Sequence, residues 1–231
     1  MSTLWEICYF CILMTAPFVD IHTHMAKAGN DLLQIINLNL EQVCPVRGYY
    51  SYGVHPWTLD SDDFRMDTAL KKLKERLKTP NVIALGEAGL DKMHKASFEQ
   101  QIDLFERQIA LSEALKKPMI LHDVKSNNEI IALRKKHKAQ QPWILHGFSG
   151  TEQDIQQLTG QGLYLSVGES LLHPERRIYN SFKYIDLDYL FLETDMADIG
   201  IESVYEAAAK RLEMDINALR AQIFSNFAKL F

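Results

Sequence analysis

Short apolar runs recur along the chain, and most of them end in a histidine, a carboxylate or a turn residue. Runs of about four to eight apolar residues bounded by Gly, Pro or Asn are typical of buried strands. On this basis we predict strands at residues 16–24, 31–38, 48–54, 82–85, 119–121, 143–145, 163–167 and 189–192. The chain therefore carries enough strands for one large sheet or barrel.

Between the later strands the apolar positions change to helical spacing. Within residues 64–77, Leu70, Leu73 and Leu77 fall on one face, and lysines lie away from it. The predicted helices are 64–77, 97–115, 127–137, 151–158, part of 171–182, 202–212 and 216–231. The linkers that join the first three strands are too short for crossover helices, which need roughly a dozen residues or more.

This alternation predicts an α/β fold, and specifically a TIM-type (β/α)8 barrel with some helices missing in the first βα units. No repeat, low-complexity tract or flexible linker marks a boundary. We therefore expect a single barrel domain over residues 1–231, with residues 1–16 as an N-terminal extension. Met14, just before the first strand, is a candidate start of translation.

Composition narrows the class of protein. Apolar residues make up 47% of the chain, enough for a large core and too many for a disordered chain. The net charge of -5 gives no general field for long nucleic acid, yet bound divalent ions can still receive one phosphate. The apolar stretch 4–19 lacks the basic start of a signal peptide and is shorter than a membrane span of about 20 residues.

The three cysteines favour a reducing compartment. Cys8, Cys11 and Cys44 cannot form an even disulfide framework, so we expect a cytoplasmic protein. Cys8 and Cys11 form a C-x-x-C pair, but their surroundings are apolar and no second pair completes a zinc knuckle. We assign this pair no metal or redox role.

Candidate metal ligands gather at the ends of the predicted strands. Asp20, His22 and His24 form a D-x-H-x-H run, in which side chains two residues apart share one face of a strand. The later apolar runs are followed by His55, Glu87, His122, His146 and Asp195. A barrel brings its strand ends together, and buried ionisable groups are costly unless paired or coordinated. A metal site explains them jointly, whereas histidines satisfied by backbone carbonyls remain the alternative for each one alone.

With these residues in view, the chain resembles the TatD family of metal-dependent hydrolases, in the amidohydrolase-like superfamily, from Phe18 to the C-terminus. The motifs that carry the resemblance are, in order, VDIHTH (19–24), YGVHP (52–56), LGEAGLD (85–91), PMILH (118–122), ILHGFSG (144–150), LETD (192–195) and NFAKLF (226–231). The resemblance implies two adjacent divalent ions, Mg, Mn or Zn, for which imidazole and carboxylate ligands are suitable.

The resemblance also implies the ligands of each ion. They are His22, His24 and Asp195 for the first, His122 and His146 for the second, and Glu87 as the bridge. Two such ions activate a water molecule and neutralise charge on a phosphoryl oxygen. Asp195 and Glu87 are the candidate catalytic residues, and Asp195 is suited to orient or deprotonate that water.

Three residues are expected on the substrate side. His55 resembles the family's substrate-side histidine, with capping of the strand end as its alternative role. Trp57 stands where many relatives have a second histidine, and an indole there would stack on a base or close the pocket. Many relatives have Arg at the position of Val124, so the adjacent Lys125 would supply a point charge instead of a fork.

Three acidic residues have alternative roles. Asp20 would fix an imidazole tautomer or complete the hydrogen bonds of its strand. Asp91 and Glu193 match family positions, but each would also serve a loop or turn.

The resemblance implies metal-dependent DNase activity, with DNA as substrate. A rival interpretation keeps the dinuclear site and changes the substrate to a small phosphoester, ester or amide, or to a misacylated tRNA. A non-enzymatic scaffold is the least favoured reading. We expect no membrane partner, and a monomer or weak homo-oligomer.

Overall fold

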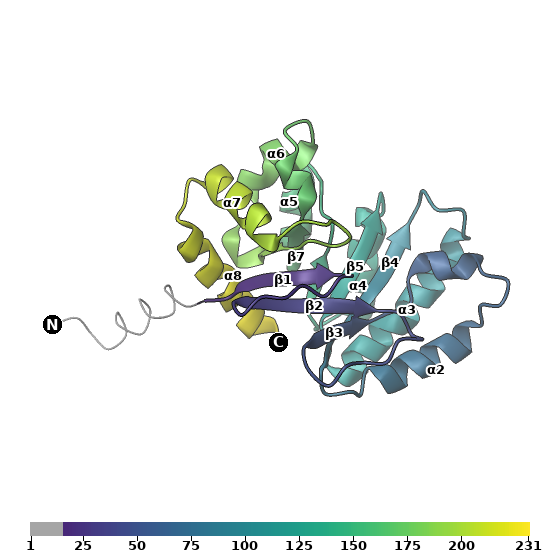
Figure 1. Cartoon of the computed structure of the whole chain (residues 1–231). Coiled ribbons are helices and arrows are strands. Elements are labelled where there is room, and N and C mark those ends of the chain that lie inside the picture. The colour runs from purple at the N-terminus through teal and green to yellow at the C-terminus, as the bar shows by residue number, and fades with distance from the viewer. Residues whose placement is uncertain (1–15) are drawn as a thin grey trace.

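The computed structural model describes residues 16–231, and in it eight parallel strands form a nearly closed barrel (Figure 1). The strands are β1 (Phe18–Thr23), β2 (Leu32–Leu38), β3 (Tyr49–Tyr52), β4 (Val82–Asp91), β5 (Met119–Val124), β6 (Trp143–Leu145), β7 (Leu163–Val167) and β8 (Leu190–Leu192). Each pairs with the next in chain order. This confirms the predicted barrel, whereas the expectations for residues 1–15, including the C-x-x-C pair and Met14, lie outside the described residues.

Helices follow only the later strands. They are α2 (Met66–Arg76), α3 (Phe98–Leu115), α4 (Asn127–His137), α5 (Glu152–Thr159), α6 (Arg177–Ser181), α7 (Ile201–Leu212) and α8 (Ile216–Leu230), with short 3-10 turns, among them η1 (Pro56–Asp60). No helix separates β1 from β2 or β2 from β3, as the short linkers predict. In Figure 1, β1 and β2 lie in front with no helix over them. No helix within residues 16–231 is long and apolar enough to cross a membrane.

β4 is longer than predicted. Gly86 and Gly89 suggest the end of a strand in the sequence, but in the structure they allow β5 to lie close to β4. The prediction ended at Leu85, but the strand continues to Asp91. Gly89 pairs with His122 of β5 and has φ +143, and a Cβ there would lie 2.0 Å from the carbonyl oxygen of His122. Only glycine fits this conformation and this spacing. The extension carries Glu87 and Asp91 toward the end of the barrel.

The seam between β1 and β8 is closed by single contacts instead of a ladder. Near the carboxyl ends, the amide of Asp195 donates to the carbonyl of His22 at 3.0 Å, and the amide of His24 donates to the carbonyl of Asp195 at 3.1 Å. Nearer the start of β1, the Tyr205 hydroxyl of α7 accepts from the amide of Val19 at 3.0 Å and donates to its carbonyl at 3.1 Å. A side chain thus satisfies the strand edge that β8 leaves open.

The interior is fully packed below the carboxyl ends. Trp143 and Phe105 are both inaccessible to solvent, and their ring centroids lie 5.6 Å apart, joining β6 to α3. Ser97 begins α3 by accepting from the amide of Gln100, and Asp215 caps α8. Packing of this kind holds the strand ends in fixed positions.

Candidate metal centre

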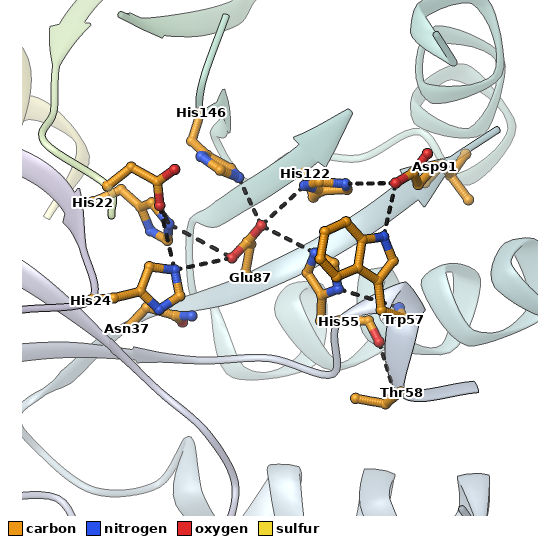
Figure 2. Close-up of polar contacts among 12 residues, drawn as sticks. His22, His24, Asn37, His55, Trp57, Thr58, Glu87, Asp91, His122 and His146 are labelled. Carbon is orange, nitrogen blue, oxygen red and sulfur yellow. Dashed lines mark hydrogen bonds and ion pairs between the residues drawn. The ribbon is translucent and has the colours of Figure 1, made fainter. Parts of the chain in front are cut away.

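All six predicted ligands converge at the carboxyl end of the barrel, where Figure 2 shows the imidazoles arranged around Glu87. They lie on or directly after five strands: His22 and His24 at β1, Glu87 on β4, His122 on β5, His146 after β6 and Asp195 after β8. This is the face where barrels of this type carry their active sites.

One oxygen of the Glu87 carboxylate faces three imidazoles. Oε1 lies 2.8 Å from Nε2 of His146, 3.1 Å from Nδ1 of His122 and 3.2 Å from Nε2 of His55. His55 therefore lies as near to the carboxylate as the two predicted ligands do, and His55, Glu87 and His122 form one group whose donor atoms lie within 4.8 Å of one another. The Nδ1 of His55 accepts from the amide of Trp57 at 3.2 Å and so caps the turn that follows β3, which leaves Nε2 to act either as a ligand or on the substrate side.

The other oxygen faces the imidazoles of β1. Oε2 of Glu87 lies 3.5 Å from Nε2 of His24 and 3.7 Å from Nε2 of His22. Oδ1 of Asp195 lies 3.4 Å and 3.5 Å from the same two nitrogens. The two oxygens of Glu87 therefore face different imidazoles, an arrangement that suits a bridging carboxylate. His22, His146 and Asp195 also form a group whose donor atoms lie within 4.8 Å of one another.

Buried polar atoms without partners fit a bound cation. His22 is inaccessible, and neither of its ring nitrogens has a hydrogen-bond partner within the described residues. An unsatisfied buried nitrogen costs about 1–3 kcal/mol, so an unpaired imidazole beside two carboxylates is unfavourable unless it coordinates. The donor set of imidazole and carboxylate, without thiolate, suits Zn²⁺, Mn²⁺ or Mg²⁺.

The charges of the metal-free site are strongly coupled. Burial raises the pKa of Glu87, but hydrogen bonds from His122, His146 and other imidazoles outweigh it and hold the pKa far below the usual range. Burial lowers the pKa of His146, but contacts with Glu193 and Glu87 raise it well above the usual value. The hydrogen bond to Glu87 also raises the pKa of His24. Glu87 is therefore ionised and available to a cation.

Two further carboxylates face the outer ring nitrogens of the second group. Oδ2 of Asp91 lies 3.4 Å from Nε2 of His122, and Oε1 of Glu193 lies 3.5 Å from Nδ1 of His146. Carboxylates in these positions select the tautomer whose other nitrogen faces the metal. Asp91 also accepts from the amide of Met93 at 2.8 Å, so it serves the turn after β4 as well.

Two roles were predicted for Asp20, fixing an imidazole tautomer or completing the hydrogen bonds of its strand, and its contacts match the second. Its carboxylate accepts from the amide of Thr194 at 3.0 Å and from the Thr194 hydroxyl at 2.6 Å, and it contacts no imidazole. Burial raises its pKa to about 7. Asp20 therefore links β1 to the segment that carries Asp195.

A large cavity opens from the ligands toward the region of the missing helix. Its volume is about 1020 Å³, and it extends between the connection from β2 to β3 and the start of α2. His55 lines it, and so does Trp57, which is 52% exposed. The Trp57 ring stacks on His94 at 5.3 Å, and its Nε1 donates to Oδ2 of Asp91 at 2.8 Å. The indole is thus held firmly at the rim.

Lys125, the third predicted substrate residue, lies apart from this cavity. It is exposed, has φ 56 in the turn between β5 and α4, and is not one of the lining residues. Sequence reasoning missed Asn37, a lining residue at the end of β2. Its position two residues after the buried Ile35 was the available signal, because alternate residues share a face.

The comparisons with known proteins agree on one family. The profile described as "TatD related DNase" matches residues 22–231. The chain is 30% identical to the 3'-5' ssDNA/RNA exonuclease TatD of Edwardsiella piscicida, over 84% of this chain and 82% of that protein. It is 29% identical to the uncharacterized metal-dependent hydrolase YjjV of Escherichia coli strain K12, over 66% of this chain but only 60% of that relative.

Solved structures agree on the fold. The crystal structure of the YjjV protein, a TatD homologue from Escherichia coli, superposes with a TM-score of 0.80 at 22% identity, covering 94% of this chain and 99% of the other. A TatD family hydrolase from Entamoeba histolytica superposes with a TM-score of 0.75 at 16% identity, covering 94% and 98%.

Proposed function

Because the chain belongs to the TatD family and is therefore a metal-dependent hydrolase acting on ester bonds, we propose that the bond it cleaves is a phosphodiester of DNA. The observation that carries the proposal is Glu87, whose two oxygens face separate groups of imidazoles. A carboxylate in this position suits two adjacent cations, the arrangement used by many phosphodiesterases.

The proposal assigns two cations to the site. Following the family resemblance, His22, His24 and Asp195 would hold one, His122 and His146 the other, and Glu87 both, which agrees with the contacts of Glu87 and Asp195 to these imidazoles. When bound, divalent ions lower the pKa of water and neutralise charge on phosphoryl oxygens. By donor chemistry we propose Mg²⁺, Mn²⁺ or Zn²⁺.

The protein's own residues orient the reactants. The Asp195 carboxylate is 39% exposed. Burial raises its pKa, but contact with the His22 imidazole and the charge of His146 together outweigh burial and lower the pKa, so the carboxylate is ionised and available to accept a proton from water. Burial lowers the pKa of His55, which leaves a neutral imidazole for a phosphate oxygen. Trp57 provides an exposed ring for a terminal base. Lys125 would contact only a longer strand.

The cavity favours a short contact with the substrate. Of its two cationic lining residues, Lys72 lies 2.6 Å from the carboxylate of Glu41, whereas the exposed Arg65 donates only through Nη1, to two backbone carbonyls. With Arg65 as the one lining cation that has no carboxylate partner within the described residues, the site would hold the end of a single strand rather than a long duplex. The same observation supports a second candidate, a small phosphodiester.

The test is hydrolysis by metal-reconstituted protein. Wild type is expected to degrade single-stranded DNA faster than duplex DNA, to lose activity in EDTA and to regain it with Mn²⁺ or Mg²⁺. Glu87→Ala is expected to be inactive, and Glu206→Ala, on the exposed face of α7, to retain full activity. Cleavage of bis(p-nitrophenyl) phosphate without cleavage of DNA would favour the small substrate. Equal DNA cleavage by wild type and Glu87→Ala would refute the assignment.

A further inference from the structure

The end of β2 contributes a polar residue to the site that has no assigned role. β1, β4, β5, β6 and β8 supply the candidate ligands, and β3 leads to His55. On β2 the corresponding residue is Asn37, which is half-buried and lines the same cavity as His24 and His55. Figure 2 draws Asn37 among the residues around Glu87.

Ser51 fixes the orientation of the Asn37 amide. Asn37 of β2 is paired with Ser51 of β3, and the Ser51 hydroxyl donates to Oδ1 of Asn37 at 3.0 Å. Ser51 is inaccessible to solvent and makes no other side-chain hydrogen bond within residues 16–231. With Oδ1 occupied, Nδ2 is left as a donor without a partner in the same part of the chain.

The chemistry of this donor selects its ligand. Nδ2 of an amide donates and does not accept, so the atom it meets must be an acceptor. It is neutral, and therefore neither repels a cation held by Glu87 and Asp195 nor loses a proton to them. Val124 stands where many relatives have an arginine, and Lys125 lies outside the cavity lining, so the end of β5 provides no cationic contact to a phosphate from within the cavity.

We propose that Asn37, held by Ser51, donates a hydrogen bond to a non-bridging oxygen of the phosphodiester that is cleaved. The inference rests on the proposed function and extends it by naming a substrate contact. Asn37 is then a catalytic residue, and Ser51 is a positioning residue that acts through it.

The first test compares variants on one phosphodiester substrate. Asn37→Ala is expected to lower kcat/KM by roughly 100-fold, the scale for losing one donor to a reacting oxyanion, with the metal content unchanged. Ser51→Ala is expected to lower it by roughly 10-fold, and the double variant to be no slower than Asn37→Ala, because Ser51 acts only through Asn37. Asn128→Ala, on the exposed side of α4, is the matched control.

A second test identifies the contacted oxygen. In wild type, sulfur replacing that oxygen in one phosphorothioate diastereomer of a dinucleotide should slow cleavage, and Mn²⁺ should not rescue it. In Asn37→Ala the same sulfur should cause no further loss. Equal rate ratios for wild type and variant with both diastereomers would overturn the proposal.

Binding of inorganic phosphate separates this inference from the proposed function. If wild type hydrolyses no phosphodiester, the proposed function fails, and calorimetry with Mn²⁺-loaded protein and phosphate decides about Asn37. Weaker phosphate binding by Asn37→Ala than by Asn128→Ala would support an oxyanion contact. Equal phosphate binding by the two variants would show that Asn37 makes no such contact.

Discussion

At the scale of single residues, the positions of the candidate ligands could be predicted from the sequence, but the hydrogen bonds around them could not. His22, Glu87 and Asp195 follow apolar runs, so their place near the carboxyl end of the barrel follows from the sequence pattern, although β4 continues past Glu87. The hydrogen bond between Asn37 and Ser51 depends on the register of β2 against β3, which the pattern does not specify.

Trp57 provides a first residue-scale prediction. Trp57→Leu should weaken binding of a single-stranded oligonucleotide about 10-fold, because stacking on an aromatic ring contributes roughly 1–3 kcal/mol per base. Trp57→Phe keeps a ring and should lose less, although it gives up the hydrogen bond to Asp91. Fluorescence anisotropy of a labelled oligonucleotide, in buffer that contains Ca²⁺, measures its binding to both variants. Equal losses for Leu and Phe would show that the indole only closes the rim.

Asp20 gives a prediction about pH. Its pKa is about 7 in the folded protein and 3.8 ordinarily, so the unfolded chain releases this proton first as the pH rises. The contribution of Asp20 to the stability of the metal-free protein should therefore fall between about pH 4 and pH 7, by up to about 4 kcal/mol. Asp20→Asn should lack this loss, because an amide does not titrate. The variant should still fold, since the Thr194 hydroxyl can donate to the Thr23 hydroxyl at 3.1 Å. Urea titrations of wild type and variant at pH 4 and pH 7.5 measure the free energy of unfolding. An equal change with pH in both proteins would contradict this prediction.

At the scale of elements, the lengths of the linkers predicted which helices are absent, but the sequence did not predict the length of β4. The absence of helices after β1 and β2 follows from the number of residues between them, which is a steric limit. The continuation of β4 past Gly86 and Gly89 depends on how closely β5 approaches, and glycine inside a strand gives an ambiguous signal.

Gly89 tests that close approach. Gly89→Ala should lower the free energy of unfolding by about 3 kcal/mol or more, because φ +143 is unfavourable for alanine and the added Cβ collides with His122. Gly29→Ala, whose nearest contact would be the Leu32 Cβ at 3.1 Å, should lose less than about 1 kcal/mol. Chemical denaturation compares them, and similar losses would mean that β4 and β5 can separate without cost.

At the scale of the whole molecule, the barrel is predictable and the way it closes is not. Eight strands imply closure, but nothing in the pattern indicates that Tyr205 of α7 would satisfy Val19 where β8 does not reach. That contact joins residues 186 positions apart in the chain.

Tyr205→Phe should therefore destabilise the whole barrel. It leaves the buried amide and carbonyl of Val19 without a partner, at a cost of about 2–4 kcal/mol. Tyr164→Phe is a matched control, because the Tyr164 ring is buried but its hydroxyl makes no hydrogen bond within residues 16–231. Thermal unfolding should separate the two variants, and equal melting temperatures would show that water replaces the hydroxyl.

Metal removal should also act on the whole molecule, because the ligands come from five strands. A metal concentration 1,000 times its Kd stabilises a protein by about 4 kcal/mol when only the folded state binds it. Calorimetry in EDTA should therefore show a single transition at lower temperature, restored by Mn²⁺. An unchanged melting temperature on adding Mn²⁺ would mean that the ligand cluster does not bind that ion.

The meeting of β1 with Asp195 also has a consequence for the time at which activity appears. His22 and His24 emerge early in synthesis, but their carboxylate partner is made 171 residues after His24, and its backbone completes the seam. A chain growing on the ribosome therefore carries only part of the candidate metal site, and no closed barrel, until Asp195 has been made. Hydrolysis at this site therefore requires synthesis through Asp195 and closure of the seam between β1 and the segment after β8.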